Sequence, residues 1–152
     1  MKVLFLDIDG IINSEDYAVY RYTTKKFDLD HFVDERAVAF LNYIIDETGA
    51  RIVLSSSWRG SYEETEERLK KAGFKYDFFD KTPYHPSRHR GTEIQEWIDK
   101  YEETHEPLES YVIIDDDNDM LESQENNFVQ CNFVHGLTSH DCYKAINILN
   151  KN

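Results

Sequence analysis

Two aspartates interrupt the first apolar run of the chain, in the stretch "VLFLDIDGII" at positions 3–12. Asp7 and Asp9 stand two positions apart, so in an extended strand both side chains point to the same side. Two carboxylates about 5 Å apart repel each other by about 3 kcal/mol at an effective dielectric near 20. A buried strand with this pattern therefore needs a cation close by, and Gly10 allows the chain to turn sharply away after it.

A second acidic cluster follows another apolar run, in "YVIIDDDNDM" at positions 111–120. If the two apolar runs are parallel strands, their carboxyl ends lie at the same edge of a sheet, where such folds carry their chemistry. Hard oxygen ligands from two strand ends suit Mg²⁺. The sequence therefore predicts a magnesium site, and its candidate ligands are Asp7, Asp9, Asp115 and Asp116.

Two further segments offer groups that can hold a phosphoryl group. Ser55 ends the apolar part of "RIVLSSSWR", and Arg90 in "SRHRGTEIQEWI" directly precedes a predicted helix whose expected cap is Thr92. A hydroxyl and a fixed cation can bind phosphoryl oxygens and offset the charge that gathers during transfer. Four separate segments thus point to one small, anionic, metal-binding centre.

The elements that must position these residues alternate between strands and helices. The predicted strands are 2–7, 51–55, 76–80, 110–115 and 127–131. Helical periodicity predicts a helix over 34–48, a second opening with a capping-box pattern at Ser61 and Glu64, a third carrying Ile94, Trp97, Ile98 and Tyr101, and a last one capped by Thr138 or Ser139. This alternation predicts an α/β fold, a three-layer, Rossmann-like parallel sheet with helices on both faces.

Composition limits the other possibilities. A chain of 152 residues that is 40% hydrophobic fits one domain, 1–152. A net charge of −13 disfavours loose electrostatic attachment to nucleic acid or anionic lipid. We find no basic leader and no apolar stretch of the roughly 18 residues that a membrane span needs, so we expect a cytoplasmic protein with no membrane partner. Cys131 and Cys142 have no metal or redox spacing and are assigned no chemistry.

The order of the four motifs resembles that of the haloacid dehalogenase (HAD) superfamily. These motifs are "LFLDIDG", "IVLSSS", "HRGTEI" and "VIIDDD", and the resemblance covers the whole chain. Within the superfamily the chain looks most similar to the small phosphatase-like domains found with RNA-repair enzymes. The resemblance implies that Asp7 is the nucleophile, which forms an aspartyl-phosphate, and that Asp9 is the general acid and base, with its backbone carbonyl as a metal ligand.

The resemblance also assigns the supporting residues. Ser55 would bind a phosphoryl oxygen, and Arg90 would fill the basic position, for which Arg88 and Lys81 are alternatives. Asp116 is the favoured metal ligand, with Asp115 orienting Arg90; the reverse assignment stays open, and Asp119 ranks third. The predicted substrate contacts are Gly10, Ser56, Arg59, Arg21, Lys25 and Lys26.

The segment at about 14–33 is the sequence's main clue to the substrate. It is too short for a helical cap domain, and 83–90 is shorter still, so we expect no large cap and an open site, which suits phosphate groups on large molecules. "YAVYRYTTKKF" interleaves Arg21, Lys25 and Lys26 with aromatic residues, an arrangement typical of single-stranded nucleic-acid contacts. Trp58 and Arg59 would extend that surface. In the alternative, the aromatic residues form a lid that packs on the domain.

The sequence therefore favours a Mg²⁺-dependent phosphomonoesterase that acts on phosphorylated ends of nucleic acid or on another large substrate. The alternatives are a small-nucleotide or phosphoprotein phosphatase, a catalytically idle phosphate-binding module, and an acidic decoy that imitates nucleic acid. No obligate protein partner is evident, and the natural substrate, the 3′ or 5′ polarity and the oligomeric state stay open.

Overall fold

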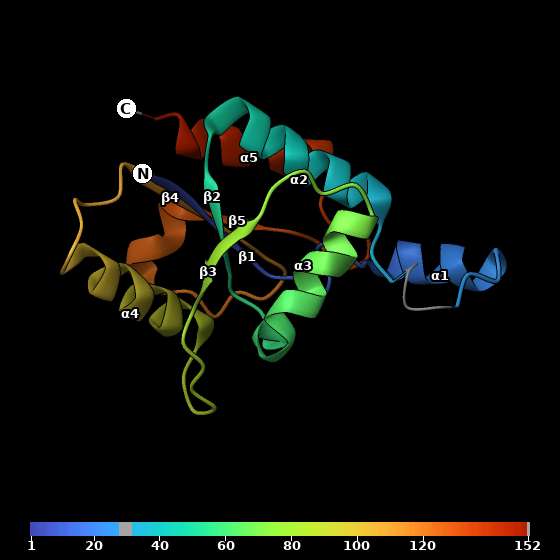
Figure 1. Ribbon diagram of the computed structural model, residues 1–152, viewed down its shortest axis with the longest axis horizontal. Helices are drawn as coiled ribbons and strands as arrows, with labels where there is room; N and C mark the ends of the chain where they lie inside the picture. Colours follow the sequence, from blue (N-terminus) through green and yellow to red (C-terminus); the bar gives the residue numbers. More distant parts are fainter. Residues whose placement is uncertain (28–31, 152) are drawn as a thin grey trace.

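The computed structural model describes residues 1–27 and 32–151, which form a parallel sheet covered by helices (Figure 1). The sheet has five strands in the order β3-β2-β1-β4-β5, all parallel to their neighbours. Their bounds are β1 Lys2–Leu6, β2 Arg51–Leu54, β3 Phe78–Lys81, β4 Ser110–Asp115 and β5 Phe128–Gln130. The most apolar strands, β1 and β4, lie at the centre, as expected of strands buried on both faces.

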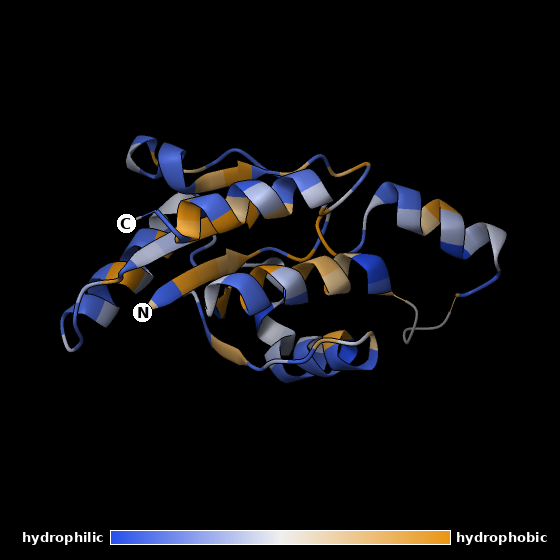
Figure 2. Ribbon diagram, turned by 90° about the horizontal axis from the view of Figure 1, so that it is seen from above, coloured by the Kyte–Doolittle hydropathy of each residue, from blue (hydrophilic) through white to orange (hydrophobic). Residues whose placement is uncertain are grey.

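The helices lie on both faces of this sheet. They are α1 Glu15–Thr23, α2 Glu35–Thr48, α3 Tyr62–Lys71, α4 Arg90–Glu102 and α5 Ser139–Leu149, with two 3₁₀ helices, η2 Ser57–Ser61 and η3 Glu122–Asn127. Leu4 and Leu6 of β1 belong to the larger core, under α2, α3 and α5. Val3 and Phe5 belong to the smaller core, under α4. The predicted three-layer α/β fold is therefore confirmed, and Figure 2 shows the apolar residues gathered along its strands.

Several local predictions are confirmed. Helix α2 begins after Asp34, whose carboxylate accepts from the Arg36 N–H, and ends at Gly49 in the left-handed conformation. The apolar residues Val38, Leu41, Ile44 and Ile45 of α2 are all buried. Strand β4 has the predicted bounds, and Thr138 caps α5.

Other local predictions are wrong at helix and strand ends. The Ser61 side chain makes no cap hydrogen bond to α3. Helix α4 begins at Arg90 after His89, so Thr92 lies inside the helix and Arg90 is its first residue rather than a residue ahead of it. Strand β3 starts at Phe78 and runs to Lys81, because its pairing follows β2 rather than the apolar run in the sequence.

Helix α1 is an element that the sequence analysis did not predict. Ser14 starts it by accepting a hydrogen bond from the Tyr17 N–H, and Glu15 and Asp16 in the first turn favour its amino end. The helix has no buried residue and stands away from the sheet (Figures 1 and 2). Positions 28–31 of the predicted insert lie outside the described residues, and the described chain has no large cap domain.

No helix in residues 1–27 and 32–151 combines the length and apolar character that crossing a membrane requires.

Gly91, the second residue of α4, allows the loop after β4 to approach this helix closely. A Cβ atom there would lie 2.5 Å from the Leu121 backbone nitrogen and 2.8 Å from the Met120 Cα atom. The Gly91 N–H donates to the Asp119 carbonyl at 3.2 Å, and the Gln124 side chain donates to the Gly91 carbonyl at 2.9 Å. This packing fixes the amino end of α4 and with it Arg90.

We predict that Gly91→Ala lowers the free energy of unfolding by about 1–3 kcal/mol, because backbone atoms must move to admit the methyl group. Urea denaturation measures the change. Gly60→Ala is the matched control, since no atom lies within 4 Å of the added Cβ there. Equal stability of the two variants would show that the contact is not tight.

Candidate active site

The carboxyl ends of the strands bring Asp7, Ser55 and Asp115 to one edge of the sheet. The Asp7 N–H donates to the Ile114 carbonyl of β4 at 3.0 Å, and the Ser55 N–H donates to the Leu6 carbonyl of β1 at 2.8 Å. Each residue thus continues the strand ladder by one position. Asp115 is the last residue of β4, the strand next to β1. Three predicted site residues from separate segments therefore lie on adjacent strands.

Asp7, Asp115 and Asp116 form a compact acidic group. Each places a carboxylate oxygen within 4.8 Å of the others, and Asp7 and Asp115 are buried. Burial, together with the charge of Asp7, raises the pKa of Asp115 to about 8. Burial likewise raises the pKa of Asp7 to about 6, against the opposing effects of Arg90 and of a hydrogen bond from Ser56. A divalent cation between these carboxylates would stabilise the ionised forms of both Asp7 and Asp115.

Gly10 fits closely against this acidic group. Its φ of +77° lies in the left-handed region, and a Cβ atom would stand 2.6 Å from Asp116 Oδ2. The glycine therefore lets the chain leave β1 sharply beside the carboxylate. Gly10 is a predicted substrate contact, and this close approach places it beside Asp116.

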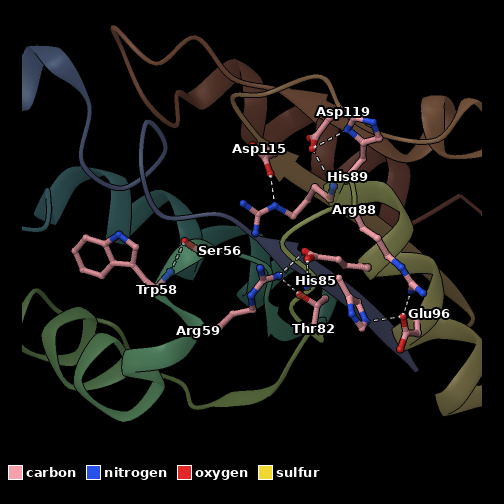
Figure 3. A network of polar contacts seen from close by, with 12 residues as sticks. Ser56, Trp58, Arg59, Thr82, His85, Arg88, His89, Glu96, Asp115 and Asp119 are labelled. Carbon is pink, nitrogen blue, oxygen red and sulfur yellow. Dashed lines mark hydrogen bonds and ion pairs between the residues drawn. The ribbon is translucent and has the colours of Figure 1, made fainter.

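Arg90 is the cation nearest to the acidic group among the three predicted candidates. Its Nε atom lies 3.7 Å from Asp115 Oδ2, and its backbone N–H donates to Asp119 Oδ2 at 2.9 Å. Asp119 thus binds the start of α4, and its Oδ2 also lies 3.9 Å from His89 Nδ1 (Figure 3). Arg88 instead binds Glu96, as Figure 3 shows, and the Lys81 Nζ donates to the Arg59 carbonyl.

Two buried donors of the site have no partner in the described residues. They are Ser55 Oγ and Arg90 Nη1. An unpaired buried polar group is costly, so such groups commonly mark a site that binds something. Ser56, fully buried beside Ser55, accepts from the Trp58 N–H at 3.3 Å (Figure 3) and hydrogen-bonds Asp7. Ser55 and Ser56, which form the serine loop after β2, therefore line the acidic group with hydroxyls.

The Asp9 side chain lies outside the acidic group and contacts two other residues. Asn13 Nδ2 donates to Asp9 Oδ1 and Trp58 Nε1 donates to Asp9 Oδ2, each at 2.9 Å. The sequence analysis did not identify Asn13, although its position four residues after Asp9 in a turn was an available signal. Trp58 was expected to extend an open surface, and its hydrogen bond to Asp9 becomes evident only in the fold.

Arg59, a predicted substrate contact, is paired within the domain. Its side chain is buried, and Nη1 donates to Glu93 Oε2 and to Thr82 Oγ1, both at 2.7 Å (Figure 3). A guanidinium so paired joins η2 to α4 and the end of β3, and it does not extend the open surface. The sequence signal for Glu93 was its place four residues before Trp97, on the inward face of α4.

Among the basic residues of the α1 segment, Arg21 is linked through aromatic rings to Asp9, which lies outside the acidic group. The Arg21 guanidinium stands 5.1 Å from the Phe32 ring centre, and Phe32 packs against Trp58 with 5.0 Å between centroids. Lys26 Nζ lies 5.7 Å from the Tyr20 ring, and Lys25 is exposed. The path from α1 to Asp9 thus runs through Phe32 and Trp58.

A parallel sheet with aspartates after its first and fourth strands, a serine after the second and an arginine opening α4 defines a HAD-type hydrolase domain. In agreement, residues 3–142 match a family model described as the HAD domain in Swiss Army Knife RNA repair proteins. The chain belongs to this family, and the resemblance inferred from the four motifs is confirmed. Comparison with curated proteins and with solved structures gave no match.

The raised pKa values predict how the stability of the metal-free protein changes with pH. Between about pH 4 and about pH 8 the folded state retains protons on Asp7 and Asp115 that the unfolded chain has released. Stability from these groups therefore falls as the pH rises through this range. We expect Asp115→Asn to become increasingly stable relative to the parent protein as the pH rises.

Urea denaturation in EDTA at several pH values measures this difference. Asp99→Asn, an exposed position on α4, is the control and should show no such trend. Magnesium should raise the stability of the parent protein more at the upper end of the range, where its ligands are ionised. A parent-to-variant difference that does not change with pH would contradict the interpretation.

Proposed function

We propose that this protein is a Mg²⁺-dependent phosphomonoesterase that works through an aspartyl-phosphate on Asp7. The proposal rests chiefly on one observation: a buried carboxylate at the end of β1 lies within 4.8 Å of two others, in a site that also holds two unpartnered donors. The carboxylates suit a cation and the donors suit an anion. A phosphate ester with Mg²⁺ satisfies both.

The donor set fits magnesium. Asp7 and Asp116 would hold the ion by their carboxylates, with Asp115 either joining them or keeping its contact to Arg90, and oxygen ligands of this kind are those that Mg²⁺ prefers. When bound, Mg²⁺ supplies positive charge that lowers the repulsion between the nucleophile and an anionic phosphate. The Asp9 carbonyl is the further ligand that the HAD resemblance implies.

The reaction we propose has two steps. A carboxylate oxygen of Asp7 forms a bond to phosphorus as the ester P–O bond breaks, and Asp9 gives a proton to the departing oxygen. Water then attacks the phosphorus of the aspartyl-phosphate, Asp9 takes a proton from that water, and the Asp7 carboxylate is released. The two steps together consume one water and return both aspartates to their starting state.

Ser55, Ser56 and Arg90 would bind the phosphoryl oxygens during both steps. The Ser55 hydroxyl and Arg90 Nη1 can donate without giving up another hydrogen bond. Asp115 keeps the guanidinium in place through its contact with Arg90 Nε. Donors already in position cost little reorganisation when charge develops on the transferring group.

The preferred substrate in this proposal is a phosphorylated end of a nucleic acid. The α1 segment offers exposed aromatic side chains at Tyr20, Tyr22 and Phe27, with Lys25 and Lys26 beside them. In a chain of net charge −13, this local group of cations favours the binding of a polyanion at the α1 segment. The description of the family, which names RNA repair, supports the same choice.

We predict that Asp7→Asn abolishes phosphate release from a terminally phosphorylated oligonucleotide, because an amide is a poor nucleophile. A malachite-green assay with and without Mg²⁺ measures the rate. Asp99→Asn, remote from the site, should retain full activity. Turnover of Asp7→Asn close to that of the parent would refute the nucleophile assignment, and inactivity of the parent on oligonucleotides, mononucleotides and phosphopeptides alike would favour an idle binding module.

The α1 surface gives a prediction about substrate size. Replacing Lys25 and Lys26 together by Glu should raise KM for a phosphorylated oligonucleotide about 10-fold at low salt, through lost phosphate contacts. Hydrolysis of a small aryl phosphate should hardly change. The control is the double replacement of Lys144 and Lys151 by Glu, on α5 and after its end, which lie away from α1 (Figure 1). Equal losses on both substrates would remove α1 from the substrate site.

A further inference from the structure

Both oxygens of the Asp9 carboxylate are held by neutral donors. Asn13 Nδ2 donates to Oδ1 and Trp58 Nε1 donates to Oδ2, at 2.9 Å each. Asn13 is itself fixed, because its Oδ1 accepts from the Gly10 N–H at 3.1 Å. The carboxylate is exposed and follows the end of β1, where a side chain without such contacts would rotate freely. The two hydrogen bonds therefore define where Asp9 points.

Trp58 is in turn held in place from three sides. Its ring packs on Phe32 with 5.0 Å between centroids, and the Arg68 guanidinium of α3 lies 5.7 Å from it. Its backbone N–H donates to Ser56 Oγ, and Ser56 is fully buried in the loop after β2. Trp58 thus connects Asp9 to α3 and to the segment before α2 through its indole, and to Ser56 through its backbone N–H.

We propose that Trp58 and Asn13 are positioning residues for Asp9, holding its carboxyl group where it can exchange a proton with the leaving-group oxygen. This inference rests on the proposed phosphatase function. Neither an indole nor an amide N–H gives up its proton at neutral pH, so both residues act only through Asp9. The proton itself passes from Asp9 to the leaving oxygen in the first step and from water to Asp9 in the second.

A positioning role predicts a dependence on the leaving group. A para-nitrophenolate ion departs readily without a proton, whereas a benzyl alkoxide departs only when it is protonated. Because proton transfer by a placed side chain contributes about 10²–10⁴-fold to a rate, misplacing Asp9 should lower kcat/KM strongly for benzyl phosphate and little for para-nitrophenyl phosphate. The second step is the same for both esters and affects only kcat. A residue that only stabilises the fold would affect the two esters alike, since they are similar in size and charge.

Trp58→Phe tests the proposal, because it keeps an aromatic ring against Phe32 and removes the N–H donor. With Mg²⁺ present, we expect kcat/KM for benzyl phosphate to fall about 10-fold or more and kcat/KM for para-nitrophenyl phosphate to stay within about 2-fold, because kcat/KM reports the first step and not the hydrolysis of the shared aspartyl-phosphate. Trp97→Phe is the matched control: its indole also donates to a carboxylate, Asp80 Oδ2, at 2.8 Å, but under α4 rather than at Asp9. It should change the ratio of the two rates little.

Asn13→Ala removes the other donor and provides a second, independent variant, with circular dichroism to verify the fold of each. It should shift the rate ratio in the same direction as Trp58→Phe. An equal fall in kcat/KM for both esters, no fall for either, or the same shift in Trp97→Phe would overturn the positioning role. Failure of the parent protein to hydrolyse para-nitrophenyl phosphate would instead refute the proposed function itself, and the inference with it.

Discussion

The crowding of three carboxylates at one edge of the sheet is the constraint on which the rest of the structure depends. Asp7, Asp115 and Asp116 come from adjacent strands, and burial makes their mutual repulsion costly. The fold alone offsets that cost only in part, through Arg90 near Asp115 and through hydroxyl contacts such as that of Ser56 to Asp7. A site with this balance favours the uptake of a cation, which is what the proposed chemistry requires.

Neighbouring elements pack closely against this edge of the sheet at two glycines. Gly10 lets the chain pass beside Asp116, and Gly91 lets the loop after β4 pack on the start of α4, which carries Arg90. Asp119 binds the backbone at that same start, so one loop supplies both the acidic residues and the support for their cation. The proposed nucleophile, the Arg90 guanidinium and the serine hydroxyls are thus positioned by strand ends and a helix start.

The proposed acid/base residue is supported differently. Asp9 leaves the acidic group and joins a network of Asn13 and Trp58, which leads through Phe32 to the arginine of α1. This separation suits the chemistry, because the nucleophile must face a cation whereas the acid must face the leaving group. In the proposed function, Trp58 and Phe32 adjoin the residue that would protonate the leaving group, in keeping with the proposed nucleic-acid substrate.

The sequence by itself determined the α/β class, the helix α2 and the four strand-end motifs, because the period of the hydrophobic residues and the polar residues that follow apolar strands are local signals. It could not determine which arginine reaches the site. Arg59 and Arg90 both follow plausible motifs, yet Glu93 buries the first in an ion pair while Asp115 holds the second near the acidic group. The helix α1 and the start of α4 were also missed or misplaced, since caps and exposed helices carry weak periodic signals. Contacts such as Trp58 to Asp9 join residues 49 positions apart, and only the packing of β1 against β2 brings them together.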